Sequence, residues 1–292
     1  MSQANLRAAV DQLEAVRESG PYPREYAAVS RAMDALAKSG SIPAVDFISR
    51  TPEQEGAANL LHHIARWPYG QVGDGILMLK YLNAYKGVID TSRWDDWVLS
   101  LPSSTTLLTR ASYVSDLLAP VTKPGTPMLE LGCGTGTVMA MLAGQNFKVA
   151  GVEILRSAIE EGQRYIQGLP CWFIQGNAFN TATYADHVIE ALGGEPEVIY
   201  SVGLFDYLSD DLIVRIIQQV TNRFPVKRLI LGNMSDHEDR GKMDWMGWKL
   251  TYRSSFDLGV LVSRALSDGP WQWSTGYEFM GNHVFADIRK TV

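Results

Sequence analysis

Three glycines at two-residue spacing follow a short apolar run near the middle of the chain. Residues 128–131 are largely apolar, and Gly132, Gly134 and Gly136 come directly after them. Residues 137–143 are mostly apolar and contain no helix breaker. A buried strand, a glycine turn and a helix open a nucleotide-binding βαβ unit, in which the glycines let the backbone approach the ligand. The pattern therefore predicts that this turn binds a nucleotide-type ligand.

An acidic side chain lies inside the predicted strand, two residues before the first glycine. The carboxylate of Glu130 would oppose the pyrophosphate of a dinucleotide, which normally lies at the N-terminus of the following helix. It would tolerate a cationic ligand, and S-adenosylmethionine carries both a sulfonium and an ammonium group. The G-x-G-x-G spacing also differs from the G-x-G-x-x-G of dinucleotide sites. Both features favour S-adenosylmethionine over NAD.

A second acid ends the next predicted strand, residues 147–154. Glu153 lies about 20 residues after the glycine turn, where such folds place the carboxylate that accepts hydrogen bonds from the ribose hydroxyls. The alternative is an ordinary turn followed by a surface acid. With the glycine turn, Glu130 and Glu153 in these positions, residues 127–234 resemble the core of class I S-adenosylmethionine-dependent methyltransferases.

This resemblance implies an α/β fold with a Rossmann-like, mostly parallel sheet. Further strands are expected within residues 171–178, 197–203 and 228–234, alternating with helices. Residues 271–279 and 282–289 predict a closing antiparallel pair, so one strand near the C-terminus should run against the others. Ligands of such sheets bind at the carboxyl ends of the strands.

Amphipathic helices are predicted before this core, at residues 3–18, 24–38 and 53–66. We therefore divide the chain into a helical cap and substrate region, 1–120, and an S-adenosylmethionine-binding catalytic domain, 121–292. Helices in front of a methyltransferase core usually cover the active site or build a homodimer. Plain packing is an equal alternative.

The resemblance also assigns cofactor contacts to the loops after the first four strands. Asn177 and the amide of Ala178 occupy the place where adenine is usually held, and Arg110 is a candidate for the cofactor carboxylate. The expected cofactor-binding set is Arg110, Glu130, Gly132, Cys133, Gly134, Thr135, Gly136, Glu153, Ile154, Asn177, Ala178, Ser201, Val202 and Gly203.

The loops after the fourth and fifth strands should face the substrate. The catalytic candidates are Asp206, Tyr207 and His237, and the substrate-binding candidates are Tyr69, Asp74, Trp245, Tyr252 and Arg253. Several have a plain alternative. Asp206 and Tyr207 could cap the next helix, Trp245 could pack in a core, and Arg253 could pair with an internal acid rather than with a substrate carboxylate.

Residues 203–208 (GLFDYL), 243–253 and 68–74, with Arg110, resemble a bacterial group that makes 3-hydroxypalmitic acid methyl ester in extracellular-factor biosynthesis. Gln71 departs from that group, which tends to carry tyrosine there. The chain resembles more loosely the bacterial methionine S-methyltransferases that begin dimethylsulfoniopropionate synthesis.

Methyl transfer is an in-line displacement, so the protein must align the nucleophile and exclude water. A phenol or amine nucleophile needs a base, whereas a thioether or a carboxylate needs none. We expect S-methylation of methionine, with Asp74 or Asp206 holding its ammonium group and Arg253 with Tyr252 its carboxylate. The alternatives are O-methylation of a hydroxy fatty acid or other small carboxylic acid, and a non-catalytic S-adenosylmethionine-binding regulator.

Composition narrows the class of protein further. The 292 residues include 46% apolar residues, enough for one large domain or two. A net charge of −6 does not favour a nucleic-acid partner, and no apolar run reaches the roughly 18 residues of a membrane span. No signal peptide is evident, two cysteines provide no disulfide framework, and no metal-ligand spacing occurs. These features predict a cytoplasmic enzyme that acts on a small molecule and holds no metal.

Overall fold

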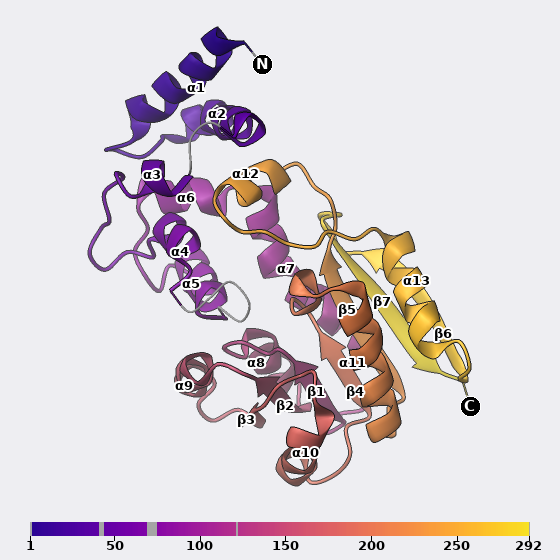
Figure 1. Cartoon of the computed structure of the whole chain (residues 1–292). Helices are drawn as coiled ribbons and strands as arrows, with labels where there is room; N and C mark the ends of the chain where they lie inside the picture. Colours follow the sequence, from indigo (N-terminus) through magenta and orange to yellow (C-terminus); the bar gives the residue numbers. More distant parts are fainter. Residues whose placement is uncertain (1, 41–43, 69–74, 121, 292) are drawn as a thin grey trace. The chain divides into compact units, whose positions relative to one another are not determined.

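The computed structural model describes residues 2–40, 44–68, 75–120 and 122–291 (Figure 1). The chain forms two compact units. Unit 1 comprises Met1–Gln71, Leu77–Thr105 and His237–Leu250, and unit 2 comprises Val72–Ile76, Thr106–Asp236 and Thr251–Val292. Unlike a single cut at residue 120, this division assigns most of the last helix before the sheet to unit 2, and the loop after residue 236 to unit 1. The role of the helical region as a cap stays a prediction.

Unit 1 is helical. It contains α1 (Gln3–Val16), η1 (Pro23–Glu25), α2 (Tyr26–Ser39), α3 (Ala44–Ile48), α4 (Leu60–Arg66), α6 (Arg93–Leu99), α12 (Arg240–Trp245) and most of α5 (Gly75–Tyr85). Aromatic rings form much of its core. Trp94 packs edge-on against Phe47 and Trp97, with ring centroids 5.8 and 5.9 Å apart. Such pairs stabilise a core beyond their buried area.

Helix α4 is shorter than the predicted helix 53–66. The carboxylate of Asp95, which is fully buried, accepts hydrogen bonds from the backbone N–H groups of Asn59 (3.1 Å) and Leu60 (2.5 Å). Asn59 itself has a positive φ of 50°. The helix therefore begins at residue 60, because a side chain 35 positions away in sequence satisfies its first amides.

Unit 2 holds the sheet. Its strands are β1 (Pro127–Leu131), β2 (Lys148–Glu153), β3 (Cys171–Gln175), β4 (Val198–Ser201), β5 (Arg228–Met234), β6 (Trp271–Tyr277) and β7 (His283–Lys290). Their order is β3-β2-β1-β4-β5-β7-β6, with β7 antiparallel to both neighbours. The expected mostly parallel sheet with one antiparallel strand near the C-terminus is confirmed.

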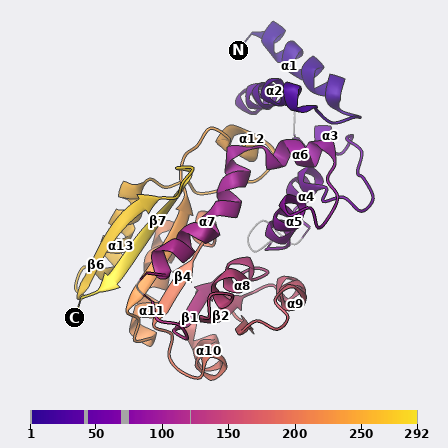
Figure 2. The same cartoon turned by 180° about the vertical axis from the view of Figure 1, so that it is seen from behind.

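The remaining helices cover the two faces of this sheet (Figures 1 and 2). They are α7 (Pro102–Leu118), α8 (Thr137–Ala143), α9 (Arg156–Tyr165), η2 (Thr181–Thr183), α10 (Ala185–Leu192), η3 (Phe205–Tyr207), α11 (Asp210–Arg223) and α13 (Ser255–Leu266). Apolar residues of α10, α11 and α13 form the core on one face, and those of α7 and α8 form the core on the other. Both faces are buried, which explains why the central strands are almost uniformly apolar.

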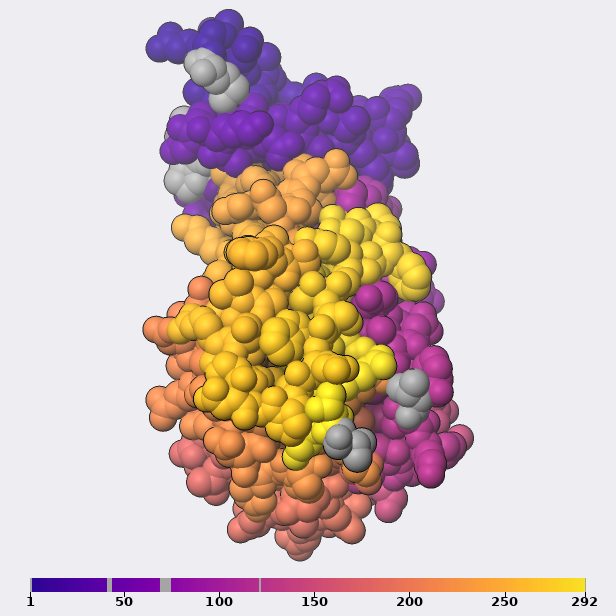
Figure 3. Space-filling model, turned by 90° about the vertical axis from the view of Figure 1, so that its right-hand side faces the viewer, coloured from indigo at the N-terminus to yellow at the C-terminus, as the bar shows by residue number. Residues whose placement is uncertain are grey.

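The C-terminal helix and hairpin of unit 2 form one face of the surface, coloured gold and yellow in Figure 3. The exposed apolar side chains there are Phe256, Val260, Trp273, Tyr277, Phe279 and Met280. In the part of the chain that the structure describes, no helix combines the length and the apolarity needed to span a bilayer.

Candidate functional site

The glycine turn between β1 and α8 has the geometry that its sequence requires. Gly132, Gly134 and Gly136 have φ angles of +67°, +55° and +72°, in the left-handed region that favours glycine. The N–H of Gly132 donates to the carbonyl of Val152 on β2 at 2.9 Å, which fixes the turn at the carboxyl ends of two neighbouring strands. Parallel α/β sheets bind their ligands at this edge.

Glu153 ties the turn to the end of β2. Its Oε2 accepts from the N–H of Gly134 at 2.8 Å, and its Oε1 accepts from the N–H groups of Ile154 and Leu155 at 2.8 and 2.9 Å. The side chain is buried, and burial raises the pKa of the carboxyl, although the three amides act in the opposite direction. A carboxylate has about four lone-pair sites, so this one retains acceptor capacity for a ribose hydroxyl.

Glu130 lies on β1, on the opposite face from Leu129 and Leu131. It is 3% exposed, and its Oε2 accepts from the hydroxyl of Tyr200 on β4 at 3.1 Å. Burial raises the pKa of Glu130 to about 8, although the Tyr200 hydroxyl and the charge of Arg110 act in the opposite direction. A cation bound nearby would restore the ionised form.

Asp206 is another buried carboxyl of this unit, in η3 close after β4. Its Oδ1 accepts from the N–H of Met234 at 2.6 Å, and its Oδ2 lies 3.9 Å from Nη1 of Arg110. Burial raises the pKa of Asp206 to about 7, although Arg110 and the Met234 amide act in the opposite direction. The guanidinium of Arg110 is thus the cation associated with both Glu130 and Asp206.

Gly203 makes room for that guanidinium. A Cβ at Gly203 would lie 3.1 Å from Nη1 of Arg110, tighter than an ordinary contact. The site is therefore assembled from α7, β1 and the exits of β4 and β5. Its ionisable groups include the buried carboxyls of Glu130 and Asp206 and the guanidinium of Arg110, which is 11% exposed, and this excess of acid favours a bound cation.

Residues 128–223, from β1 to the end of α11, match the family model described as a methyltransferase domain. These residues are a methyltransferase domain. Its methyl donor is S-adenosylmethionine, whose positive charge suits the buried acid Glu130 near the end of β1. No curated protein is significantly similar to the chain in sequence.

Among solved structures, a possible exported protein from Bordetella parapertussis has 12% sequence identity and a TM-score of 0.62, with all of both chains covered. This likeness concerns the fold. The magnesium protoporphyrin IX methyltransferase from Synechocystis PCC 6803 with bound SAH has 16% identity and a TM-score of 0.48, covering 63% of this chain and 83% of that one. The plantazolicin methyltransferase has 14% identity and a TM-score of 0.49, covering 79% and 99%.

The remaining expected cofactor residues of the methyltransferase domain lie along the same edge of the sheet. Asn177 uses its Oδ1 to accept from the N–H of Phe179 at 2.9 Å, which closes its own turn after β3. Ser201 is buried and donates to the carbonyl of Leu131 at 3.0 Å, linking β4 to β1. Ala178, Val202 and Cys133 are buried, whereas Ile154 is 53% exposed. Burial raises the pKa of the Cys133 thiol well above its usual value, which disfavours a thiolate.

The guanidinium of Arg253 makes its hydrogen bonds to residues of unit 2. Its Nε and Nη2 donate to Oδ1 of Asp210 at 3.0 and 2.7 Å. Its Nη1 donates to Oδ1 of Asn233 and to the carbonyl of Phe205, and Nη2 also donates to the carbonyl of Leu208. With its donors held in this way, Arg253 fits the internal pairing that the sequence left open, and its geometry gives no support to a substrate carboxylate.

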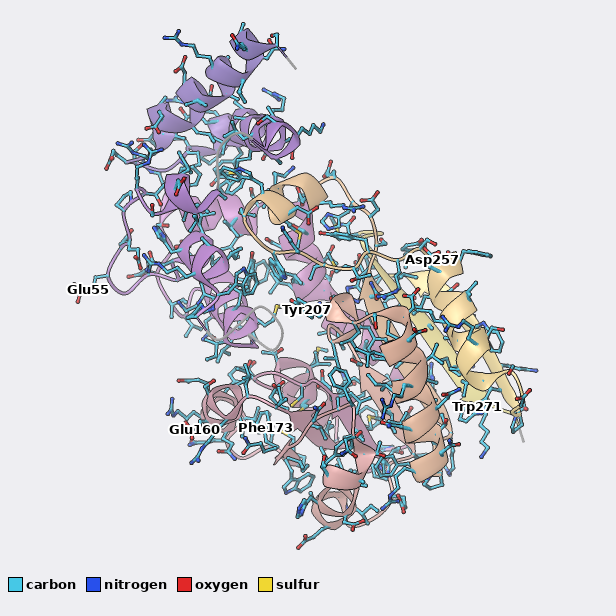
Figure 4. All side chains as sticks on the ribbon, in the orientation of Figure 1. Glu55, Glu160, Phe173, Tyr207, Asp257 and Trp271 are labelled. Carbon is cyan, nitrogen blue, oxygen red and sulfur yellow. The ribbon has the colours of Figure 1, made fainter. Side chains whose placement is uncertain are left out.

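The other substrate candidates are divided between the units. Tyr207 (labelled in Figure 4) lies in η3 beside Asp206, and Tyr252 precedes Arg253 in unit 2. Trp245 belongs to unit 1, where its ring lies 6.3 Å from that of Phe47. This contact supports core packing for Trp245.

His237 also belongs to unit 1, and its Nδ1 accepts from the N–H of Asp239 at 3.2 Å. This bond shapes the loop before α12. Tyr69 and Asp74 lie outside the described residues. Among residues 2–40, 44–68, 75–120 and 122–291, no group of three His, Cys, Asp or Glu side chains could hold a metal ion. The expectation of a metal-free enzyme stays a prediction.

Sequence reasoning missed two members of the buried cluster. Tyr200, which follows Val198 and Ile199 on β4, could have been found as the donor that a buried Glu130 needs. His283 on β7 is fully buried, stacks on Phe285, and lies opposite Met234 in the register of β5 and β7. Burial and the nearby charge of Arg110 hold the pKa of His283 well below its usual value, so this imidazole is neutral. No local signal predicts this position.

Replacing Gly134 with valine should abolish S-adenosylmethionine binding. A Cβ there would lie 3.0 Å from Cα of Gly75, and valine at a φ of +55° is strained, so the amide that donates to Glu153 must shift. The added side chain would collide with the backbone at the start of α5, and this collision, rather than a clash with the ligand, would distort the turn. Isothermal titration calorimetry measures the loss.

The matched control is Gly193→Val. Gly193 has a similar φ of +70°, but a Cβ there has nothing within 4 Å. We expect this variant to lose about 1–2 kcal/mol of stability and to retain full binding. If Gly134→Val still bound the cofactor, the turn would not be the binding site.

Proposed function

We propose that the chain transfers the methyl group of S-adenosylmethionine to a small acceptor that carries a positive charge, with methionine, methylated on sulfur, as the first candidate. The observation that carries this proposal is that two buried carboxyls, near the ends of β1 and β4, interact with a single shared arginine. Glu130 and Asp206, whose pKa values are raised to about 8 and about 7, share the charge of Arg110. Such carboxyls gain most from a cationic ligand, because burial disfavours their ionised form when no partner is present.

The two acids have separate roles in this proposal. Glu130 lies on β1, two residues before the first glycine of the turn, and would interact with the ammonium group of the cofactor. Asp206, after β4, would hold the ammonium group of the acceptor. Because Arg253 is held by Asp210 and Asn233, recognition of the acceptor rests on the ammonium side rather than on an Arg253–carboxylate pair.

The chemistry then requires alignment more than proton transfer. A lone pair of the thioether sulfur forms the new S–CH₃ bond while the bond between the methyl carbon and the cofactor sulfur breaks. S-adenosylhomocysteine leaves, and no proton is released from the nucleophile. The protein contributes by holding the two sulfur atoms in line with the methyl carbon and by excluding water.

The second candidate is O-methylation of a small carboxylic acid or hydroxy fatty acid, favoured by the resemblance of residues 203–208 and by the cation of Arg110 near the exit of β4. Its nucleophile needs no base either. A non-catalytic S-adenosylmethionine-binding regulator is the third. We further propose a cytoplasmic enzyme without a nucleic-acid partner, whose helical unit covers the acceptor or forms a homodimer.

A product assay with methyl-labelled S-adenosylmethionine separates the three functions. The acceptors are methionine, its des-amino analogue 4-(methylthio)butanoate, and 3-hydroxypalmitate. Labelled S-methylmethionine, without label on the des-amino compound, supports the proposal because the ammonium group is then required. A labelled ester from either carboxylic acid indicates O-methylation. Cofactor binding without transfer to any acceptor indicates the regulator.

The pH dependence of the methionine reaction should come from binding and not from the chemical step. Asp206 must ionise to hold an ammonium group, so KM for methionine should fall as pH rises through about 7, the pKa of Asp206. At saturating methionine the single-turnover rate should stay flat, because a thioether does not titrate. Asp206→Asn should raise KM and remove its pH dependence.

His237→Ala is the companion variant. For a thioether acceptor it should leave the flat single-turnover profile unchanged. A steep rise of that rate between about pH 6 and 8 that disappears in His237→Ala would instead indicate a base and a protic nucleophile, contrary to both the thioether and the carboxylate proposals.

A further inference from the structure

A cavity lies at the end of the sheet opposite the glycine turn. A cavity of about 510 Å³ opens at the amino ends of β1, β4 and β5 and beside the end of β7. All of its lining residues belong to unit 2: Thr122, Lys123, Thr126, Glu197, Val198, Lys227, Arg228, Arg289 and Lys290. At about 3.3 Å per residue, the five residues of β1 separate it from the glycine turn by roughly 16 Å.

Figure 4 shows residues at the two ends of the sheet of unit 2. Tyr207 lies at the exit of β4, on the side of the cofactor turn, whereas Trp271 begins β6 at the other end. Nζ of Lys290 lies 5.8 Å from the ring centroid of Trp271. No residue assigned to methyl transfer lines this cavity, so it is a separate site.

The charge of the cavity is opposite to that of the chain. Its lining contains three exposed lysines, Lys123, Lys227 and Lys290, and the arginines Arg228 and Arg289 of the β5–β7 pair. The lining includes one acid, Glu197, whereas the chain as a whole has a net charge of −6. Nζ of Lys227 lies 2.7 Å from Oε2 of Glu197, which neutralises one of these cations. The hydroxyl of Thr122 adds a neutral donor, whereas that of Thr126 donates to the carbonyl of Lys123 at 2.7 Å. The lining therefore has an excess of positive charge.

Arg228 provides the most specific feature. Its side chain is 7% exposed, and its Nε and Nη2 donate to the two carboxylate oxygens of Asp287 at 2.7 and 2.9 Å. Arg289 donates to the same carboxylate at 2.6 Å. Two guanidinium groups thus share one acid, and Nη1 of Arg228 has no hydrogen-bond partner among the described residues. A buried donor of a charged group that makes no hydrogen bond is costly, and an anion in the cavity would reduce that cost.

We propose that this cavity binds a small phosphate-bearing anion. A phosphate group offers several acceptor oxygens to arginine, lysine and threonine donors, and arginine matches its geometry particularly well. The volume lies in the range of pockets that hold small molecules rather than of surfaces that track a polymer. Inorganic phosphate and a phosphorylated metabolite share this chemistry.

Calorimetry on the full chain tests the proposal, with the cofactor site first saturated with S-adenosylhomocysteine. The probes are inorganic phosphate, pyrophosphate and ribose 5-phosphate, each compared with sodium chloride at equal ionic strength. We expect one site per chain, with sodium chloride giving no heat beyond dilution. Tighter binding of ribose 5-phosphate than of inorganic phosphate assigns the site to phosphorylated metabolites, and the reverse order assigns it to the free ion.

The test variant is the double replacement Lys123→Gln and Lys290→Gln, which changes two exposed lysines of the lining and leaves the Lys227–Glu197 pair intact. Each lost charge-assisted hydrogen bond should weaken phosphate binding about tenfold or more. The control is Arg264→Gln on α13, which removes an exposed cation, that of the ion pair with Asp211, outside the cavity. It should leave phosphate binding unchanged.

Three results would overturn the proposal. The first is no binding of any of the three phosphate compounds to the unmodified chain at about 10 mM. The second is equal affinity in the double variant, which would place the anion elsewhere. The third is equal weakening by Arg264→Gln, which would indicate the general charge of the surface. Circular dichroism confirms that each variant is folded.

Discussion

Glu153→Ala should raise the Kd for S-adenosylmethionine by a factor of about 10²–10⁴ while the domain stays folded. Two charge-assisted hydrogen bonds to the ribose hydroxyls, each contributing about 1.5–3 kcal/mol, are lost. The variant also leaves the N–H groups of Gly134, Ile154 and Leu155 without their acceptor, so the turn itself loosens. Isothermal titration calorimetry gives the affinity, and circular dichroism the folded state.

Glu153→Gln should weaken cofactor binding less than Glu153→Ala does. The amide oxygen can still accept from Ile154 and Leu155, but the amide nitrogen cannot accept from Gly134, so the variant should bind with an affinity between those of the wild type and Glu153→Ala. An unchanged Kd in a folded Glu153→Ala protein would exclude this carboxylate from the cofactor site.

Arg110→Met should destabilise the ligand-free protein by about 2 kcal/mol at pH near 8, because it removes the cation that favours ionisation of both Glu130 and Asp206, which are partly ionised at that pH. The loss should be smaller near pH 5.5, where Glu130 and Asp206 are protonated in both proteins. Urea unfolding at the two pH values measures the difference. The control is Arg156→Met, in which the replaced arginine is 80% exposed and pairs with Glu160, so less than about 1 kcal/mol should be lost.

The direction of the pH effect follows from the raised pKa values. A carboxyl whose folded-state pKa is about 8 binds more protons in the folded chain than in the unfolded chain above its ordinary value of 4.5. Its contribution to stability is complete below that value and is lost as pH rises toward 8. The ligand-free wild type should therefore become less stable over this interval, and Arg110→Met more steeply. Equal losses of unfolding free energy at both pH values would show that Arg110 does not favour the ionised form of these carboxyls.

The local motifs were predictable because each depends on a short stretch of chain. The left-handed turn needs Gly132, Gly134 and Gly136 themselves, and Glu153 reaches the turn because β1 and β2 are adjacent parallel strands. The alternation of strands and helices likewise predicts the layered sheet. Each of these inferences rests on backbone geometry and short connections.

Partnerships between distant residues were not predictable. Arg253 meets Asp210 and Asn233, and His283 lies beside Met234, because of pairings formed by strands and loops far apart in sequence. The same residue types in other registers could have contacted a substrate. The assignment of residues 237–250 to unit 1 could not be predicted from the sequence for a related reason. Lys242 on α12 is buried and pairs with Asp34 on α2, so a loop that follows β5 folds with the N-terminal helices.

The position of β7 has a consequence for synthesis of the chain. β7 follows β6 in the sequence but lies between β5 and β6 in the sheet. While a ribosome makes the chain, β5 emerges complete, with every residue destined for burial, yet its second hydrogen-bonding edge has no partner until residues 283–290 appear. An open apolar strand edge invites pairing with other nascent chains. Folding of this sheet must therefore finish after translation of its last strand, and loss of that strand would expose β5 permanently.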